Sequence, residues 1–457
     1  MKYRFIVTGV LSAVVMVSGC TEDDSTETDG TGGTSTGGTG GSAGSSGTGA
    51  EGGDGPVGCT TEGTGTVEID VSGLPDGVDA SGALAGTGVL EPFTSDTTFE
   101  DLPTGDYSVD AEVVLDDDPI VRSVFLPTVR GGDFCLEDGA TEVVDVTYDA
   151  IPSSNKLWTS NLLGFPSSEL RASGEGDPVV AEAPAGKDLA FDEDGNLWAF
   201  GATLAEPLLV RFPAAELGES GEKAWDVAIG VPAIECIPAV RALAFDGPDL
   251  WLSVCGNQVM KFTDAAFADS GDLEPDLVIS ELPGNEDIVT NDKGLWVASG
   301  SSILLYEPRA DGESSAPPEL TLTVRDAEDS RDLDPTGLTF DADGNLWGFC
   351  FGSNGIFKVD ADDLEGTGEQ TVVAAVSFFL GVDILVAPGA FDNGGGLWVS
   401  YGNGRLGRLS PEQLEVSSGT GEAVTPDRIV TNDALESELS LAFFANPPGV
   451  PLAPGFD

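Results

Sequence analysis

One short unit of sequence recurs five times along the chain, and it constrains the possible folds more than any other feature. Each copy runs through a short apolar strand and a turn rich in Gly, Asn and Asp to a tryptophan. The copies cover residues 188–198, 242–251, 287–296, 337–347 and 389–398. The six tryptophans in this register, Trp158 included, are 40 to 53 residues apart. A period in this range is typical of folds that stack one supersecondary unit against the next.

Further strands complete each unit. The tryptophan lies in a second strand after the turn. A third apolar strand follows, as at 208–212 and 258–262, and a polar Gly/Ser connection leads to a fourth, as at 276–280 and 320–324. Four short strands at this spacing predict an all-β fold, a β-propeller, in which each unit is one blade. The common register of the tryptophans predicts that they pack between neighbouring blades.

The two ends of the repeat region complement each other. Residues 155–158 hold only the second half of a unit, whereas 438–444 resembles a first strand with no tryptophan after it. We therefore expect six blades over residues 156–446, with the C-terminal strand pairing beside 156–158 to close the ring. Closure of this kind removes exposed sheet edges.

The repeated unit has a characteristic sequence pattern. Gly-Leu-Thr-Phe-Asp-Ala-Asp-Gly-Asn-Leu-Trp at 337–347, with its four counterparts, resembles the repeats of NHL-like propellers and of bacterial extracellular propellers. The resemblance covers residues 156–446, about two thirds of the chain. It implies the fold and leaves the function open, because such propellers serve as enzymes, binding platforms and passive scaffolds.

The N-terminus has the features of an export signal. Lys2 and Arg4 precede an apolar stretch, 5–17, that is too short to span a bilayer. The stretch ends in Val17-Ser18-Gly19-Cys20, which resembles the lipobox of bacterial lipoproteins. The resemblance implies removal of a signal peptide, 1–19, and a lipid on Cys20 that anchors the protein in the cell envelope. Enterobacterial lipoproteins with Asp after the cysteine stay at the inner membrane, so Thr21 favours the outer membrane. Ordinary secretion is the alternative.

Two segments separate the anchor from the repeats. Residues 20–58 are dominated by Gly, Thr and Ser and cannot offset their ordering entropy by burial, so they predict a disordered linker. Within 59–150, the stretches 66–71 and 142–148 alternate polar and apolar residues, which predicts strands of a small β-sandwich. This domain is interpreted as a spacer, with a ligand-binding module as the alternative. Residues 447–457 form a C-terminal tail.

The segment 99–109 resembles the late hairpin of carboxypeptidase-regulatory-like and Cna-B-like domains. Some Cna-B-like domains carry a Lys–Asn crosslink, which is excluded here because 59–150 contains no lysine. Cysteines offer other crosslinks in an exported protein. Cys59 and Cys135 bracket the segment and predict one disulfide, Cys236 and Cys255 form a second candidate pair, and Cys350 is expected to be unpaired or buried.

Composition excludes several classes of function. The 457 residues carry 79 acidic and 19 basic side chains, a net charge of −60, and no histidine. This charge excludes ordinary nucleic-acid binding, which needs basic surfaces. The lack of histidine excludes Ser-His-Asp and Cys-His catalysis, and with them the chemistry of streptogramin-lyase-like propellers, which share the repeat style and depend on histidine. The acidity indicates adaptation to salt or, alternatively, a cation-binding surface.

Two turns look like the start of calcium loops. They are the Asp-Glu-Asp-Gly-Asn run at 192–196 and the Asp-Ala-Asp-Gly-Asn run at 341–345. A calcium loop needs further ligands and a distal Glu, whereas Asp, Gly and Asn also satisfy the geometry of a hairpin turn. Structural turns are therefore the preferred interpretation, and calcium is the alternative.

The central channel is the default ligand site of a propeller. Its mouth is expected to hold the charged residues that precede the first strands, namely Asp188, Arg241, Glu286, Asp287 and Glu438. In the gluconolactonase-like six-bladed family, Glu, Asn and Asp hold a divalent metal in this channel. The present sequence does not match that family's ligand motifs residue by residue. We therefore expect solvated charges and no resident cofactor, with a metal site as the alternative.

These observations predict a membrane-anchored, exported lipoprotein whose propeller is a non-enzymatic binding or scaffold module for an unknown protein or glycan partner. No catalytic residue is assigned. The alternatives are a lactonase-like hydrolase with a divalent cation, such as calcium, in the channel, and a purely structural envelope protein.

Overall fold

The computed structural model describes residues 62–444 apart from 87, 183–187, 204–205, 231–239, 255–256, 264–269, 308–316, 328–329, 351–354, 375, 379–387, 402–403, 416–423 and 436–438. The predicted signal peptide, lipidated Cys20, linker and C-terminal tail lie outside these residues. All described residues belong to one unit, Gly58–Asp457. Within the described ranges, none of the helices has the length and apolar character needed to cross a bilayer.

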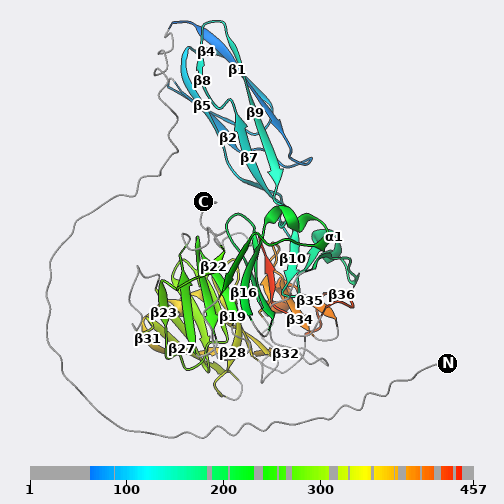
Figure 1. Cartoon of the computed structure of the whole chain (residues 1–457), viewed down its shortest axis with the longest axis vertical. Coiled ribbons are helices and arrows are strands. Elements are labelled where there is room, and N and C mark those ends of the chain that lie inside the picture. The colour runs from blue at the N-terminus through cyan, green and yellow to red at the C-terminus, as the bar shows by residue number, and fades with distance from the viewer. Residues whose placement is uncertain are drawn as a thin grey trace, which may run out of the picture. The chain divides into compact units, whose positions relative to one another are not determined.

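The described chain is almost entirely β, as the alternating and short apolar patterns predict. Its helices are single turns that connect strands: α1 (Ser167–Leu170), η1 (Ala214–Gly218), η3 (Ala361–Leu364) and α2 (Pro411–Glu415). Most of the backbone polar groups are therefore satisfied in sheets, which Figure 1 shows as arrows.

Two sheets form the part before residue 151. One has the order β4 (Thr97–Pro103), β1 (Thr64–Ser72), β9 (Thr141–Ala150), β7 (Val124–Arg130) and β6 (Val114–Leu115). The other has the order β3 (Val89–Phe93), β2 (Gly82–Gly86), β5 (Gly105–Ala111) and β8 (Asp133–Leu136). Val67 and Val144 from the first sheet and Leu84 and Tyr107 from the second share one hydrophobic core. The alternating stretches 66–71 and 142–148 lie in β1 and β9, which pair in parallel.

The remaining sheets follow one another along the chain, and each is called a blade and numbered in chain order. Blades 1 to 3 consist of β37 (Leu441–Phe443), β10 (Lys156–Thr159), β11 (Leu163–Pro166) and β13 (Val179–Glu182); of β14 (Leu189–Phe191), β15 (Leu197–Thr203), β16 (Glu206–Phe212) and β18 (Val227–Gly230); and of β19 (Val240–Asp246), β20 (Asp249–Val254), β21 (Gln258–Phe262) and β23 (Leu277–Ile279).

The next three sheets repeat this antiparallel pattern. They consist of β24 (Asp287–Asn291), β25 (Gly294–Ser299), β26 (Ser302–Tyr306) and β27 (Leu320–Asp326); of β28 (Pro335–Phe340), β29 (Leu346–Cys350), β30 (Gly355–Val359) and β32 (Val376–Phe378); and of β33 (Ala390–Phe391), β34 (Leu397–Tyr401), β35 (Arg405–Leu409) and β36 (Arg428–Thr431). The first strand of each sheet contacts the first strand of the next. This arrangement is the predicted β-propeller.

The two ends of the repeat region meet in blade 1. The C-terminal strand β37 pairs antiparallel with β10, so that Leu157 lies opposite Phe443 and Trp158 lies opposite Ala442. Figure 1 shows β37 in red beside β10. β37 also contacts the first strands of blades 2 and 6. The half-unit at 155–158 thus lies next to the strand that its sequence lacks.

The outer edges of several blades are covered by chain from the following blade. The short strands β12 (Gly174–Glu175), β17 (Gly221–Glu222) and β22 (Gly271–Asp272) pair in parallel with the last strands of blades 6, 1 and 2. Each follows a serine whose hydroxyl accepts an N–H from the covered strand at 3.0 Å, namely Ser173, Ser220 and Ser270. β31 (Gly368–Ala374) covers β27 in the same way. The polar Gly/Ser connections of the sequence therefore protect sheet edges.

The tryptophans pack between blades, as their register predicts. Trp198 lies 6.0 Å from the ring of Phe245 in the next blade, and Trp296 lies 6.0 Å from Phe340. Trp347 has the same relationship to Phe391 at 5.6 Å. Tilted and edge-on ring pairs at these distances are favourable beyond the area they bury.

Candidate binding sites in the propeller

Two buried carboxyl groups link the innermost strands. Asp188 immediately precedes β14 of blade 2, and its Oδ2 accepts the backbone N–H of Leu243 in blade 3 at 2.8 Å. Asp287 begins β24 of blade 4, and its Oδ2 accepts the N–H of Leu338 in blade 5 at 2.6 Å. The hydroxyl of Ser440, beside β37, also bonds to Asp188. Each carboxyl group thus satisfies polar groups of a neighbouring inner strand, which would otherwise be buried without a partner.

Burial changes the protonation of both groups. Desolvation raises the pKa of Asp188 to about 6, although hydrogen bonds from Leu243, Leu189 and Ser440 oppose the shift. Desolvation and the nearby charge of Asp188 together raise the pKa of Asp287 well above its ordinary value. The two groups are 7% and 3% exposed. The expectation of solvated charges is therefore wrong for these two residues, because the closely packed inner strands bury the position that precedes them.

The other predicted channel residues differ. Arg241 and Glu286 form an ion pair between blades 3 and 4, and both remain partly exposed. Glu438 lies outside the described residues. Among the described residues, no group of three Asp, Glu or Cys side chains converges closely enough to hold a metal ion. Four of the five predicted residues thus lie at the inner strands. Asp188 and Asp287 bond there to backbone amides and, for Asp188, to Ser440, whereas Arg241 and Glu286 pair with one another.

The calcium-like turns have a structural role. Asp341 Oδ2 accepts the indole N–H of Trp347 at 2.8 Å, and Asp341 Oδ1 accepts the N–H of Asn345 at 2.9 Å. Asn345 Oδ1 in turn accepts the N–H of Ala361, the first residue of η3, at 3.0 Å. Asp192 and Asn196 make the same set of bonds to Trp198 and Ala214. The Asp and Asn oxygens of these turns are thus engaged by the fold itself.

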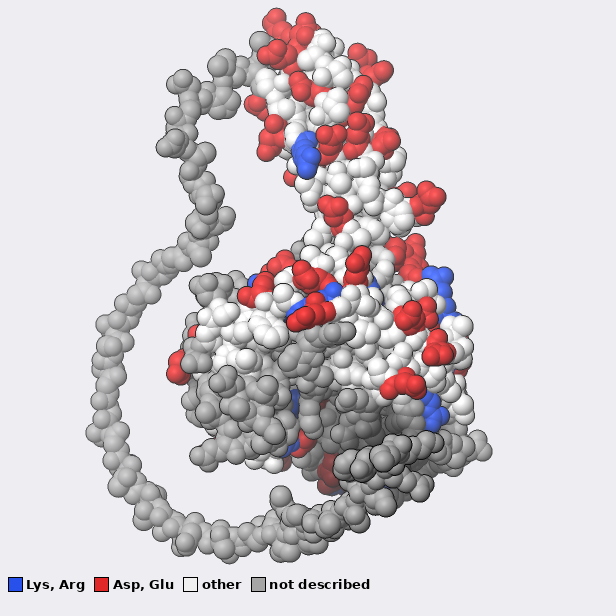
Figure 2. Space-filling view, turned by 45° about the vertical axis from the view of Figure 1, so that its right-hand side comes forward, with Lys and Arg blue, Asp and Glu red and all other residues white. Residues whose placement is uncertain are grey.

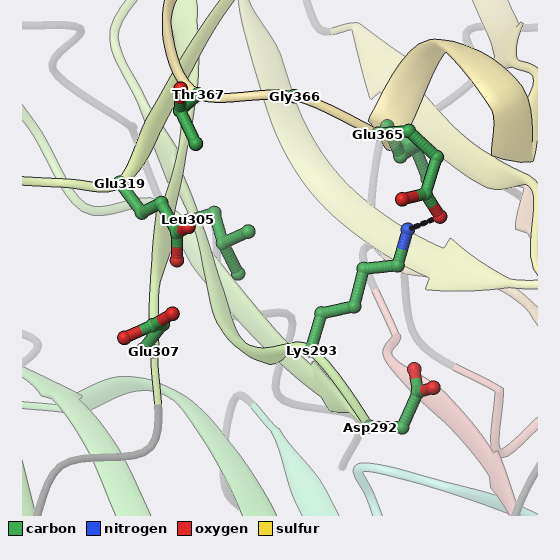
Figure 3. A pocket seen from close by; sticks show the side chains of 9 residues that line it. Asp292, Lys293, Leu305, Glu307, Glu319, Glu365, Gly366 and Thr367 are labelled. Carbon is green, nitrogen blue, oxygen red and sulfur yellow. Dashed lines mark hydrogen bonds and ion pairs between the residues drawn. The ribbon is translucent and has the colours of Figure 1, made fainter.

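A groove between blades 4 and 5 is the more open candidate site. It has a volume of about 510 Å³, and its lining residues are Asp292, Lys293, Leu305, Glu307, Glu319, Leu364, Glu365, Gly366 and Thr367. Figure 3 shows the Lys293 side chain reaching to Glu365, with Glu307 and Glu319 on the other side of the groove. Buried Leu305 and Leu364 contribute an apolar lining between the charges.

A second hollow of about 290 Å³ adjoins the groove. The residues it shares with the groove are Asp292, Lys293, Leu364 and Glu365. Its other lining includes Phe340 and the Asp341–Gly344 turn of blade 5. Cavities in this range of volumes are typical of ligand-binding sites. The turn that resembled a calcium loop therefore forms one wall of a larger site.

The groove could not be predicted from the sequence. Lys293 comes from the turn between β24 and β25, Glu307 follows β26, and Glu365 follows η3 of the next blade. The residues are up to 72 positions apart and share no local motif. Two weak signals are present in the sequence. The turn of blade 4 carries a lysine, Lys293, directly before its glycine, and acidic residues flank the third and fourth strands of this blade.

Acidity is not confined to the groove. In the view of Figure 2, Asp and Glu are spread over the described surface, and Lys and Arg are few. Many of the cations have an acidic neighbour, as in the pairs of Arg211 with Asp226 at 2.8 Å and of Lys261 with Asp249 at 2.6 Å. A general surface field attracts cations over the whole molecule, so a specific site must be recognised by its shape as well as its charge.

The cysteine predictions are covered only in part. Cys135 lies on β8 and Cys350 is buried on β29. Cys59, Cys236 and Cys255 lie outside the described residues, so both disulfide pairings stay predictions.

The known proteins that resemble the chain are distant from it. Neither a family model nor a curated protein matches the sequence. Among solved structures, virginiamycin B lyase from Staphylococcus aureus is 15% identical, with 65% of this chain and 83% of the lyase covered and a TM-score of 0.34. The β-propeller domain of Cps50 (Swd1) from Myceliophteria thermophila is 9% identical, with 55% and 73% covered and a TM-score of 0.34.

Regucalcin, a calcium-binding protein from Agrobacterium tumefaciens, is 17% identical, with 56% of this chain and 75% of regucalcin covered and a TM-score of 0.33. The names of the three structures describe a lyase, a β-propeller domain and a calcium-binding protein. Similarities at this level do not transfer a ligand or a reaction to the present chain.

Proposed function

We propose that the chain is an exported lipoprotein, anchored through Cys20 in the cell envelope, whose propeller is a non-enzymatic binding module. The six blades would form a ring closed by β37 on β10, held off the lipid surface by the linker 20–58. The lipobox-like 17–20 segment and the composition of the linker support this proposal from the sequence.

The groove between blades 4 and 5 is the observation that carries the binding role. It combines a ligand-sized volume with buried leucines and partly exposed charges, whereas the inner-strand carboxyl groups are bonded to the backbone. Groups that are already satisfied and buried must give up those bonds before they can bind a ligand. Recognition at the groove breaks no buried bond to the backbone of this kind.

Site-specific photo-crosslinking of the full chain in envelopes tests this role. We would introduce p-benzoylphenylalanine in place of Thr367 in the groove and, as a control, in place of exposed Asp433 near blade 6. We expect one defined crosslinked partner from position 367 that is lost when Glu307→Gln is added. Identical crosslinks from both positions, or none from position 367, would overturn the proposal.

The lipid anchor is tested separately. Growth with a labelled fatty acid should label the wild-type chain, and Cys20→Ala should remove the label and release the protein from membranes. Label that persists in Cys20→Ala, or an unlabelled wild-type chain, would favour ordinary secretion.

A metal-dependent, lactonase-like hydrolase is the second candidate. The juxtaposition of Asp188 and Asp287 near the inner strands, with Glu286 beside them, is the observation that favours it. Calorimetry with calcium on the full chain in detergent would detect such a site. Binding tighter than about 10 µM, together with lactone hydrolysis that Asp188→Asn and Asp287→Asn abolish, would replace the binding module with the enzyme.

A further inference from the structure

One ion pair crosses the groove between blades 4 and 5. Lys293 Nζ, from the β24–β25 turn of blade 4, bonds to the carboxylate of Glu365, which follows η3 in blade 5. Both residues line both hollows, so the pair lies where the groove of about 510 Å³ adjoins the hollow of about 290 Å³. The pair therefore lies at the boundary between the groove and the second hollow.

The Lys293 side chain shows what kind of group the groove accommodates. Its four-carbon stem lies in a site that Leu305 and Leu364 also line, and its ammonium group meets a carboxylate at the end. Asp292 and Glu307 add further negative charge to the same lining. An apolar stem that ends in an ammonium group is the chemistry of a lysine side chain. The groove thus already holds one lysine side chain, that of Lys293.

The pair is also easy to open. The Lys293 and Glu365 side chains are 29% and 72% exposed. Ion pairs with this degree of exposure contribute little to stability, because water solvates the separated charges well. A competing ammonium group can therefore replace Lys293 on Glu365 without disturbing the hydrophobic core.

We propose that the groove between blades 4 and 5 binds a lysine-containing extended segment of a partner protein, and that Lys293 occupies the position of the partner's lysine until that segment binds. An extended chain could occupy the groove and the adjoining hollow together, because Glu365 lines both. The proposal deepens the proposed binding function and rests on it. It assigns Glu365 as the carboxylate that receives the incoming ammonium group.

The ligand class follows from the geometry of the acidic groups. A calcium ion needs six to eight oxygen ligands around one point, and within the described residues the acidic side chains of the groove do not converge in that way. They are spread along the groove, as Figure 3 shows for Asp292, Glu307 and Glu365. Spread charges suit a ligand whose positive groups are also spread along a chain.

Titration with an acetylated, fluorescent tetralysine peptide tests the proposal on the full chain in detergent, at near-physiological salt. The informative variant is Lys293→Met. Its matched control is Lys358→Met, which removes the same charge from another partly exposed ion pair, that with Asp360 at 2.9 Å, outside the groove lining. We expect Lys293→Met to bind the peptide about fivefold more tightly, by release of Glu365, and Lys358→Met to bind within twofold of wild type.

A second matched pair tests the receiving carboxylate. Glu365→Gln should weaken peptide binding about fivefold, whereas Asp360→Asn, at a similarly exposed carboxylate, should not. Equal effects within the two pairs would indicate a general surface field and overturn the proposal. Spermidine binding as tightly as the peptide, with the same response to Lys293→Met, would replace the protein partner with a free polyamine.

The test separates this inference from the binding function on which it rests. A partner that crosslinks at position 367 while tetralysine fails to bind would overturn the lysine assignment and leave the binding module intact. Loss of both signals would overturn both.

Discussion

The carboxyl group of Asp188 accepts the backbone N–H of Leu243 at 2.8 Å, which joins the innermost strands of blades 2 and 3. Asp287 and Leu338 repeat this bond between blades 4 and 5. The two positions are equivalent in the repeat, where Ala242 and Gly337 alternate with them. Asp188 and Asp287 thus each join one blade to the next, and burial makes each bond dependent on protonation.

The stability of the propeller should fall as the pH rises through about 6. The folded-state pKa of Asp188, about 6, is above the ordinary value of 3.8. The neutral form therefore stabilises the fold fully below pH 4, and this contribution is lost as the group ionises. The difference corresponds to at most about 3 kcal/mol between pH 4 and pH 8. Thermal melts of the full chain across this range would measure it.

Asp188→Asn should flatten this pH dependence, because an amide keeps the hydrogen-bonding oxygen and cannot ionise. Asp226→Asn is the control: the hydrogen bond and charge of Arg211 lower the pKa of Asp226, so its contribution is present above pH 4 and is lost on acidification. A slope that is unchanged in Asp188→Asn would show that this buried pair does not control stability.

Arg408 should be indispensable for the stability of blade 6. Its guanidinium bonds to both oxygens of Asp392, at 2.5 and 3.1 Å, and Asp392 also accepts the indole N–H of Trp398. Both ionic partners are almost fully buried. Arg408→Leu would leave Asp392 without its counter-ion and should cost about 3–5 kcal/mol in urea denaturation.

The control for Arg408 is Arg211→Leu. Arg211 makes the same bidentate bond to Asp226, but the side chains are 25% and 42% exposed. Its loss should cost about 1 kcal/mol or less. Similar losses for the two variants would mean that the Asp392 site is better solvated than its burial indicates.

The repeat, the blade strands and the position of the tryptophans could be predicted, because the sequence pattern that specifies them recurs in several units. Trp198, Trp296 and Trp347 recur at the same place in a local pattern, and their aromatic partners recur with them. The groove could not be found in this way, since Lys293 and Glu365 come from different blades and are 72 residues apart. Burial of Asp188 was missed because it depends on how tightly the inner strands approach, which no single unit encodes.

The pairing of β37 with β10 should make the last strand essential. Deletion of 441–457 removes Leu441 and Phe443, which are buried beside β10. We expect a loss of about 4 kcal/mol or more and rapid proteolysis of blade 1. Deletion of 447–457 alone is the control and should leave the melting temperature unchanged. Equal stability of the two truncated chains would contradict closure by this strand.

Two neighbouring aspartates distinguish a structural turn from a calcium site. Asp341→Ala removes the acceptor of the Trp347 indole and of Asn345 and should destabilise the chain by about 2–3 kcal/mol in urea, with or without calcium. Asp343→Ala removes an exposed carboxylate and should change stability by less than about 0.5 kcal/mol. If the turn held calcium, both residues would be ligands, and both variants would lose a calcium-dependent increase in stability. A calcium-dependent difference between wild type and Asp343→Ala would therefore contradict the structural role assigned to this turn.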